Sequence, residues 1–328
     1  MGEVAYPAWN SGILLNYILM AQIIETNFFG DLTQSDEPKV LIIPTPYEYT
    51  TSFCKGTKNG PQTILNASTK LEFFDDELWI DHSKIGINTS SFVNCEFVNN
   101  KSTQPFVELE QVVKSTIING SLPIVIGGEG SISYGAIKAT YDLYPELSIL
   151  HFDAHSNLKS TFKNNKFNHL CTIRQIYNSM PDIKIVQAGI RNISKEESEW
   201  LDKESPNIEI FFAKDKNRWT VADILSSLTK NVYISFDFSI FDSSVMPSCS
   251  NPEPGGFTFE QITNIIKNIC AFKDIVGIDF VEFSPLLNFV APDYLASKLI
   301  YKTIGYTFAR QLGVFEEKET EKLVVSES

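Results

Sequence analysis

The stretch LSILHFDAHSNLKS, residues 147–160, changes character at its centre. Its first six residues are mostly apolar and have the length of a buried strand. Beyond them, polar residues occupy alternate positions, namely Asp153, His155, Asn157 and Lys159. Because alternate residues of an extended chain lie on one face, we predict that these side chains converge where the strand leaves its sheet.

Seven further short runs rich in Ile, Val and Phe also have the length of strands. They are KVLIIP (39–44), KIGIN (84–88), LPIVIGG (122–128), IKIVQAG (183–189), IEIFFA (208–213), NVYISFD (231–237) and IVGIDFVEF (275–283). Amphipathic helical patterns separate most of the runs, as in residues 105–119 and 257–269. This alternation predicts an α/β fold with a parallel sheet, helices on both faces, and a ligand site at the carboxyl ends of the strands.

The domain organisation follows from composition along the chain. No composition break divides residues 36–314, which we take as one domain that includes a final helix over 293–312. The N-terminal extension, 1–35, contains the apolar segment 12–24, which is interrupted by polar amides and is too short to span a membrane. We interpret this segment as a docking helix and residues 315–328 as a charged, solvated tail.

Composition argues against several classes of protein. The 328 residues include 43% hydrophobic and 20% charged residues, as is typical of a soluble globular protein. Lys and Arg total 27 against 40 Asp and Glu, a net charge of −13, and no basic run would favour nucleic acid as a partner. Five scattered cysteines without a CxxC spacing indicate reduced thiols. We therefore expect a cytoplasmic protein with neither membrane nor nucleic-acid partners.

Four of the predicted strands end in unusual polar sequences. These are GGEGS (127–131), DAHSN (153–157), SFDFS (235–239) and VEFSP (281–285). They resemble the signatures of the ureohydrolase family, which comprises arginases, agmatinases and formiminoglutamases. The longer stretch SFDFSIFDSSVMPSCSNPEPGGFTFEQ, residues 235–261, is similar to a long motif of that family, and residues 46–75 and 187–200 resemble its agmatinase branch.

The resemblance implies an arginase-like three-layer α/β fold with an eight-stranded parallel sheet, assembled as a trimer or hexamer. It also implies two manganese ions, held by four Asp and two His, that activate water against a guanidinium carbon. Matched position by position, three of these ligands are present: Asp153, His155 and Asp237. The other three positions hold Gly130, Asn157 and Ser239. We therefore expect a degraded metal site.

The resemblance assigns roles to three more residues. His169 matches a histidine implicated in proton transfer, and Glu282 matches the glutamate that orients the guanidinium. Lys159 lies where family members place residues that face the substrate. These matches predict a pocket for a guanidino or related small molecule.

Less specific interpretations stand beside these roles. His169 could be a hydrogen-bonded interior histidine, and Glu282 could pair with a neighbouring Lys or Arg. We interpret His151 as structural and His82 as a surface residue. Glu129 has no precedent as a ligand in the motif, so its role stays open.

The charges of the remaining metal ligands limit which cations the site could hold. Asp153 and Asp237 would repel each other without a cation, and one of them would then hold a proton through a raised pKa. One Mn²⁺ or another divalent cation on Asp153, His155 and Asp237 would balance the charge. The ammonium group of Lys159 would do so with no metal at all.

A nucleotide-binding interpretation competes for the GGEGS segment. The pattern Gly128-x-Gly130-x-x-Ser133 approximates a dinucleotide fingerprint, with Asp153 as the ribose contact. Against it, a serine replaces the third glycine and Glu129 would place a negative charge beside the pyrophosphate.

The residues thus lead to two functional hypotheses. The first is an agmatinase-like ureohydrolase homologue that holds at most one divalent cation and hydrolyses guanidino C–N bonds weakly or not at all. The second is a non-catalytic protein that binds a ligand or assembles with an active paralogue. Whether the chain is an enzyme is left open between them.

Overall fold

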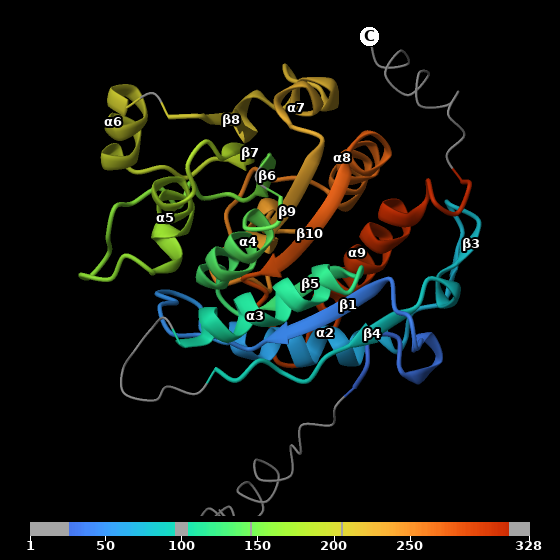
Figure 1. Cartoon of the computed structure of the whole chain (residues 1–328). Helices are drawn as coiled ribbons and strands as arrows, with labels where there is room; N and C mark the ends of the chain where they lie inside the picture. Colours follow the sequence, from blue (N-terminus) through green and yellow to red (C-terminus); the bar gives the residue numbers. More distant parts are fainter. Residues whose placement is uncertain (1–25, 96–103, 145, 205, 315–328) are drawn as a thin grey trace, which may run out of the picture.

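The structure, a computed structural model, describes residues 26–95, 104–144, 146–204 and 206–314. An eight-stranded parallel sheet in the order β4-β1-β5-β10-β9-β6-β7-β8 forms its centre (Figure 1). Its strands are β1 (Val40–Thr45), β4 (Ile87–Thr89), β5 (Leu122–Gly127), β6 (Leu147–Phe152), β7 (Lys184–Ile190), β8 (Ile208–Phe212), β9 (Asn231–Asp237) and β10 (Asp274–Val281). Each of the eight predicted runs overlaps one of these strands, so the predicted sheet is confirmed. A short antiparallel pair, β2 (Phe74–Asp75) and β3 (Ile80–Asp81), lies outside it.

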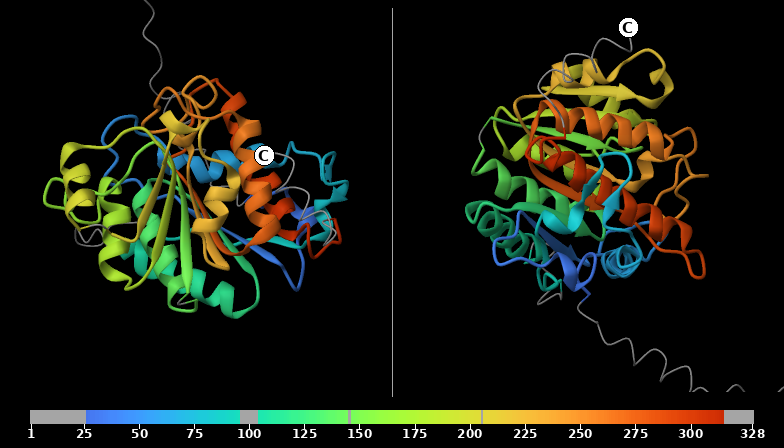
Figure 2. Two further views of the ribbon diagram at one scale, coloured as in Figure 1. Left: turned by 90° about the horizontal axis from the view of Figure 1, so that it is seen from above. Right: turned by 90° about the vertical axis from the view of Figure 1, so that its right-hand side faces the viewer.

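Helices cover both faces of the sheet, which gives three layers (Figure 2). One face packs against α2 (Gly60–Ser68), α7 (Val221–Ser227), α8 (Phe259–Phe272) and α9 (Ala291–Phe308). The other packs against α3 (Gln104–Ile118), α4 (Ser133–Tyr141) and α5 (Thr172–Ser179), with α6 (Lys195–Glu204) at its margin. The predicted helices over 105–119, 257–269 and 293–312 correspond to α3, α8 and α9.

Strand β9 shows why these sequences read as unbroken apolar runs. Val232, Ile234 and Phe236 pack into the core beneath α8 and α9, whereas Tyr233 packs into the core beneath α3 and α4. A central strand of a parallel sheet is buried on both faces, so both sets of alternating positions must be apolar. Two buried polar residues interrupt this pattern, Ser235 within the strand and Asp237 at its end, and Asp237 lies where a site is expected.

The four polar motifs follow four neighbouring strands at the centre of the sheet. β5, β10, β9 and β6 are adjacent in that order, and all four are parallel. Their carboxyl ends consequently lie at the same edge of the sheet. This topology brings the motifs together although up to 150 residues separate them along the chain.

His82 corrects one prediction. It was expected at the surface, but its side chain is fully buried and stacks on Tyr301 of α9, with ring centroids 4.0 Å apart. Gly305, one turn further along α9, leaves room for the imidazole. The polar residues around His82 in the sequence hide this contact with a helix more than 200 residues away.

Two sequence predictions lie outside the described residues: the docking helix at 12–24 and the charged tail at 315–328. Among the helices that the structure describes, none has the length and apolar character that crossing a bilayer requires.

Candidate active site

Asp153 and Asp237 lie at the carboxyl ends of the neighbouring strands β6 and β9, and both are buried. Ser239 connects them. Its amide donates to Asp237 Oδ1 over 2.7 Å, and its hydroxyl donates to Asp153 Oδ1 over 2.7 Å. The structure therefore brings the two carboxylates around one shared neighbour.

Both oxygens of Asp153 accept hydrogen bonds. Oδ1 accepts from the amide of His155 at 2.8 Å and from its Nδ1 at 3.2 Å, in addition to Ser239. Oδ2 accepts from Asn157 Nδ2 at 2.6 Å and lies 3.3 Å from His151 Nε2. Asn157 and Ser239, two of the positions at which the resemblance placed metal ligands, thus serve as hydrogen-bond donors to the carboxylate.

The path of the chain after β6 differs from the predicted extended one. The strand ends at Phe152, and Asn157 adopts a left-handed conformation with φ 52° that turns its amide back to Asp153. The chain therefore turns before Lys159, whose amide donates to the carbonyl of Leu170 at 3.2 Å. Among the ion pairs of the described residues, none joins Lys159 to Asp153 or Asp237. The chain is therefore not extended as far as Lys159, and its role toward a substrate stays a prediction.

The pKa values of the two aspartates move in opposite directions. Burial alone would raise the pKa of Asp153, but hydrogen bonds and charge from His151 and His155 outweigh it and hold that pKa well below its usual range. Burial, followed by repulsion from Asp153 and Glu282, raises the pKa of Asp237 well above its ordinary value. The two carboxyl groups therefore differ, because the surroundings of Asp153 favour its charged form and those of Asp237 favour its protonated form.

The pKa of His155, the residue beside Asp153, is also shifted. Burial disfavours its charged form, but the hydrogen bond and charge of Asp153, and the charge of Glu253, raise its pKa. Its Nε2 lies 3.6 Å from Glu253 Oε1. Arg191, which sequence reasoning missed, fixes this wall by donating to the carbonyls of Ser239 and Glu253 at 2.7 and 2.8 Å. Its signal was its place within the agmatinase-like stretch 187–200.

Glu282 faces Gly130 across the site. The amide of Gly130 donates to Glu282 Oε1 at 2.6 Å, and the Ser250 hydroxyl donates to Oε2. Glu282 itself has φ 67°, a conformation that non-glycine residues rarely adopt and that is often found at functional sites. A Cβ atom at position 130 would lie 3.3 Å from Glu282 Oε1, so the missing side chain leaves the space that the carboxylate uses.

Glu129, whose role the sequence left open, is fully buried and holds the loop after β1. Its Oε2 accepts from the amides of Tyr49 and Thr51 at 2.6 and 3.0 Å. Its Oε1 accepts from the hydroxyls of Thr50 and Ser131, both at 2.6 Å. Backbone amides grouped in this way form an anion-binding nest, and here the protein's own carboxylate fills it.

The nucleotide-binding interpretation of this segment is wrong. A pyrophosphate would need the backbone amides of the glycine-rich turn, but that of Gly130 is used by Glu282. Gly128 packs directly against the backbone of Tyr47, so its lack of a side chain serves packing within the protein.

A small cavity joins most of the predicted site residues. It is lined by His155, Asn157, His169, Leu170, Asp237, Ser239, Ser250, Asn251 and Glu282. The space open to the centre of a water molecule is about 10 Å³, which is room for about one water. Ser250 and Asn251 were not singled out from the sequence, although they lie inside the stretch 235–261 that carries the resemblance.

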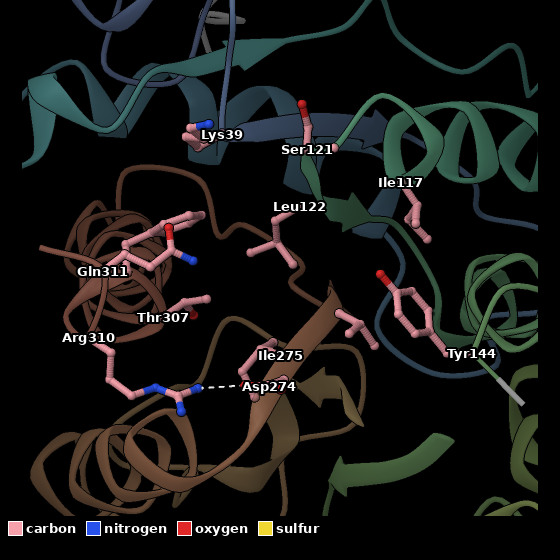
Figure 3. Close-up of a pocket in the computed structure, with 13 residues that line it drawn as sticks. Lys39, Ile117, Ser121, Leu122, Tyr144, Asp274, Ile275, Thr307, Arg310 and Gln311 are labelled. Carbon is pink, nitrogen blue, oxygen red and sulfur yellow. Dashed lines mark hydrogen bonds and ion pairs between the residues drawn. The ribbon is translucent and has the colours of Figure 1, made fainter. Parts of the chain in front are cut away.

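A roomier cavity, about 390 Å³ in volume, lies at the opposite end of the sheet (Figure 3). Lys39, Leu122 and Asp274 place it at the amino ends of β1, β5 and β10. Arg310 on its wall is paired with Asp274 at 2.9 Å. The cavity contains none of the predicted site residues, so its size alone carries no functional argument.

Three of the positions at which the resemblance implies metal ligands hold residues without a carboxylate or an imidazole. Gly130 has no side chain to offer a donor atom, and Asn157 and Ser239 direct hydrogens at Asp153. Within the described residues, no group of three or more His, Cys, Asp or Glu side chains is arranged to hold a metal ion.

Comparison with known proteins identifies the class. The sequence matches the Arginase family over residues 38–305, and the chain belongs to that family. It is 29% identical over 288 residues to an N(1)-aminopropylagmatine ureohydrolase from Synechocystis sp., covering 84% of this chain and 91% of the relative. It is 31% identical over 265 residues to an agmatinase from Pyrococcus horikoshii, covering 81% and 90%.

Solved structures agree with this assignment. The crystal structure of an agmatine ureohydrolase from Thermoplasma volcanium matches with a TM-score of 0.78 at 25% identity, over 91% of this chain and 99% of the other. The resemblance to ureohydrolases and the arginase-like fold are therefore confirmed. The individual roles of the site residues stay predictions.

Proposed function

We propose that this chain is a ureohydrolase homologue in which hydrogen bonds and a proton have taken the place of the dimanganese centre. It would hold at most one divalent cation, on Asp153, His155 and Asp237. It would hydrolyse guanidino C–N bonds weakly or not at all, and would in that sense be a pseudoenzyme.

The observation that carries the proposal is the pair of donors on Asp153. Carboxylate oxygens bind hard cations through the same lone pairs that accept hydrogen bonds. Asn157 at 2.6 Å and Ser239 at 2.7 Å use those lone pairs, one on each oxygen. A cation would have to displace them, and neither neutral side chain restores the negative charge that a second divalent ion requires.

The size of the cavity supports weak or absent turnover. A guanidinium group has four heavy atoms, whereas the space between His169 and Glu282 has room for about one water molecule. Binding of agmatine would require these walls to separate.

The proposal is tested by measuring metal content and urea release together. Purified protein incubated in millimolar Mn²⁺ should retain at most one ion per chain and release little or no product from agmatine, arginine or formiminoglutamate. The triple variant Gly130→His, Asn157→Asp, Ser239→Asp should gain manganese. Alanine at the same three positions is the matched control and should gain none. Two bound ions with rapid turnover in the unaltered chain would overturn the proposal.

A second candidate is a non-catalytic role in binding or assembly, as a homo-oligomer or with an active paralogue. Apolar side chains gathered before α9 favour it: Leu286, Leu287, Phe289 and Val290 are 46, 92, 44 and 73% exposed. Such a cluster is typical of an interface. Light scattering of the chain, and of a Leu287→Asp, Val290→Asp variant, tests this. A monomer in both cases would exclude the homo-oligomer.

We also propose a cytoplasmic location. All five cysteines are free, which suits a reducing compartment.

A further inference from the structure

The hydroxyl of Thr50 lies between a carboxylate and an imidazole. It is 2.6 Å from Glu129 Oε1 and 2.9 Å from His169 Nδ1. The backbone amide of His169 also donates to it, at 3.0 Å. Glu129 and His169 are buried, at 0 and 4% exposure, and Thr50 between them is half-buried.

Counting hydrogens fixes the direction of each bond. The hydroxyl has one hydrogen to donate and two lone pairs. Glu129 Oε1 also accepts from Ser131, and Oε2 accepts from backbone amides, which is the environment of an ionised carboxylate. The hydrogen between Glu129 and Thr50 therefore comes from Thr50. The hydroxyl oxygen is then left as an acceptor toward His169.

We infer that Glu129, acting through Thr50, holds the neutral His169 ring with its proton on Nδ1, so that Nε2 is the proton acceptor of the cavity. The surroundings of Nε2, on the other side of the His169 ring, support this inference. Nε2 is buried and has no hydrogen-bond partner among the described residues, and His169 lines the cavity with Glu282 and Asn157. Glu129 and Thr50 are positioning residues, because they act on the cavity through His169.

The chemical consequence concerns what the cavity accepts. An unprotonated Nε2 beside the carboxyl group of Glu282 favours a ligand that donates hydrogen bonds, such as water, ammonium or an amidinium N–H. It disfavours an anion. The inference does not depend on whether the chain hydrolyses guanidino compounds, so its test uses no activity measurement.

The experiment is nuclear magnetic resonance of the full chain labelled with ¹⁵N-histidine, at a pH where the ring is neutral. Correlations between ring nitrogens and ring hydrogens distinguish the two tautomers. The chain has four histidines, so His169→Gln assigns the signals by their loss. We expect His169 to show a protonated Nδ1 and an unprotonated Nε2.

Glu129→Gln is the decisive variant. Its amide oxygen should take the place of Oε2, facing the backbone amides of Tyr49 and Thr51, and its NH₂ group should face Thr50. The Thr50 hydroxyl would then donate to Nδ1, and the His169 proton should move to Nε2. Thr50→Ser keeps the hydroxyl and Ser131→Ala keeps the carboxylate, so both controls should retain the original tautomer.

Each outcome decides the inference. A proton on Nε2 of His169 in the unaltered protein would overturn it, as would an unchanged tautomer in folded Glu129→Gln. If that variant does not fold, Thr50→Val replaces it. Valine leaves an Nδ1 hydrogen buried without an acceptor, so the population with a protonated Nδ1 should fall. No fall would contradict the role of Thr50.

Discussion

Ser239 and Asp153 form a 2.7 Å hydrogen bond between the ends of neighbouring strands, with the serine as donor. The same serine presents its amide to Asp237, so one residue serves both buried carboxylates. We propose that this hydroxyl takes the place that a metal ion would have between the two carboxylates. The contribution of these two hydrogen bonds to stability can be measured in metal-free protein.

Removing a donor from Asp153 should destabilise the fold. Asn157→Ala and Ser239→Ala each leave a buried, charged oxygen short of one hydrogen bond, which costs roughly 1–3 kcal/mol. The free energy of unfolding in urea, measured without metal, checks this. Ser226→Ala on the exposed surface of α7 is the control and should stay within about 0.5 kcal/mol of the original. Equal stabilities for all variants would show that these hydrogen bonds do not support Asp153.

Asp153 and Asp237 should respond oppositely to amide substitution. Asp153→Asn places an NH₂ group among donors and removes a stabilised charge, which should cost roughly 3 kcal/mol at pH 7. Asp237→Asn replaces a carboxyl group whose raised pKa favours the protonated form, so we expect this variant to be neutral or stabilising at pH 7. Urea unfolding of both variants measures the difference. Equal losses in the two variants would contradict the opposite pKa shifts of the two aspartates.

The pH dependence of these variants provides a second check. The lowered pKa of Asp153 contributes stability above the unfolded value of about 3.9, which is lost as the pH falls through the folded value. The raised pKa of Asp237 contributes stability below about 3.9, which is lost as the pH rises toward its folded value. The advantage of Asp237→Asn should therefore grow between pH 4 and pH 7. A stability advantage of Asp237→Asn that shrinks between pH 4 and pH 7 would contradict the raised pKa of Asp237.

Two neighbouring glycines should differ sharply in tolerance. A Cβ atom on Gly128 would overlap the backbone of Tyr47, whereas one on Gly130 would meet Glu282 Oε1 at 3.3 Å. Backbone cannot move aside as a side chain can. We predict that Gly128→Ala loses more than about 3 kcal/mol of stability and Gly130→Ala less than about 1 kcal/mol. Similar melting temperatures for the two variants would contradict this packing.

His82 should titrate far below an ordinary histidine. Burial, opposed by the charge of Asp75, lowers the pKa of His82 to about 4. Its neutral form contributes stability above the unfolded value of about 6.5, which is lost as the pH falls toward 4 and amounts to at most roughly 3 kcal/mol. The ¹⁵N signals of His82 followed between pH 7 and 4 measure the midpoint. A midpoint near 6.5 would place the ring in contact with water.

Most of the fold could be read from the sequence because buried parallel strands are apolar on both faces. The eight runs and the polar residues that end four of them, such as Asp153 and Asp237, locate the site without coordinates. The alternation of side chains along a strand does not apply beyond Phe152, where β6 ends. Asn157 then leaves the extended conformation with φ 52°. The extended path predicted as far as Lys159 is wrong for that reason.

Contacts between residues far apart along the chain could not be predicted from the sequence. Glu129 meets the loop at residues 49–51, about 80 positions away, and its nest of backbone amides has no side-chain signature. His82 lies among polar neighbours but packs under α9. Such pairings depend on which elements the topology places side by side.

The most direct test of the central claim is the number of manganese ions that the unaltered chain binds. Calorimetric titration of metal-free protein with Mn²⁺, with elemental analysis of the saturated sample, gives that number. Our account predicts one ion or none per chain, and no binding in Asp153→Ala. Two tightly held ions per chain would mean that Asn157 and Ser239 do not occupy the place of a metal centre, and would contradict it.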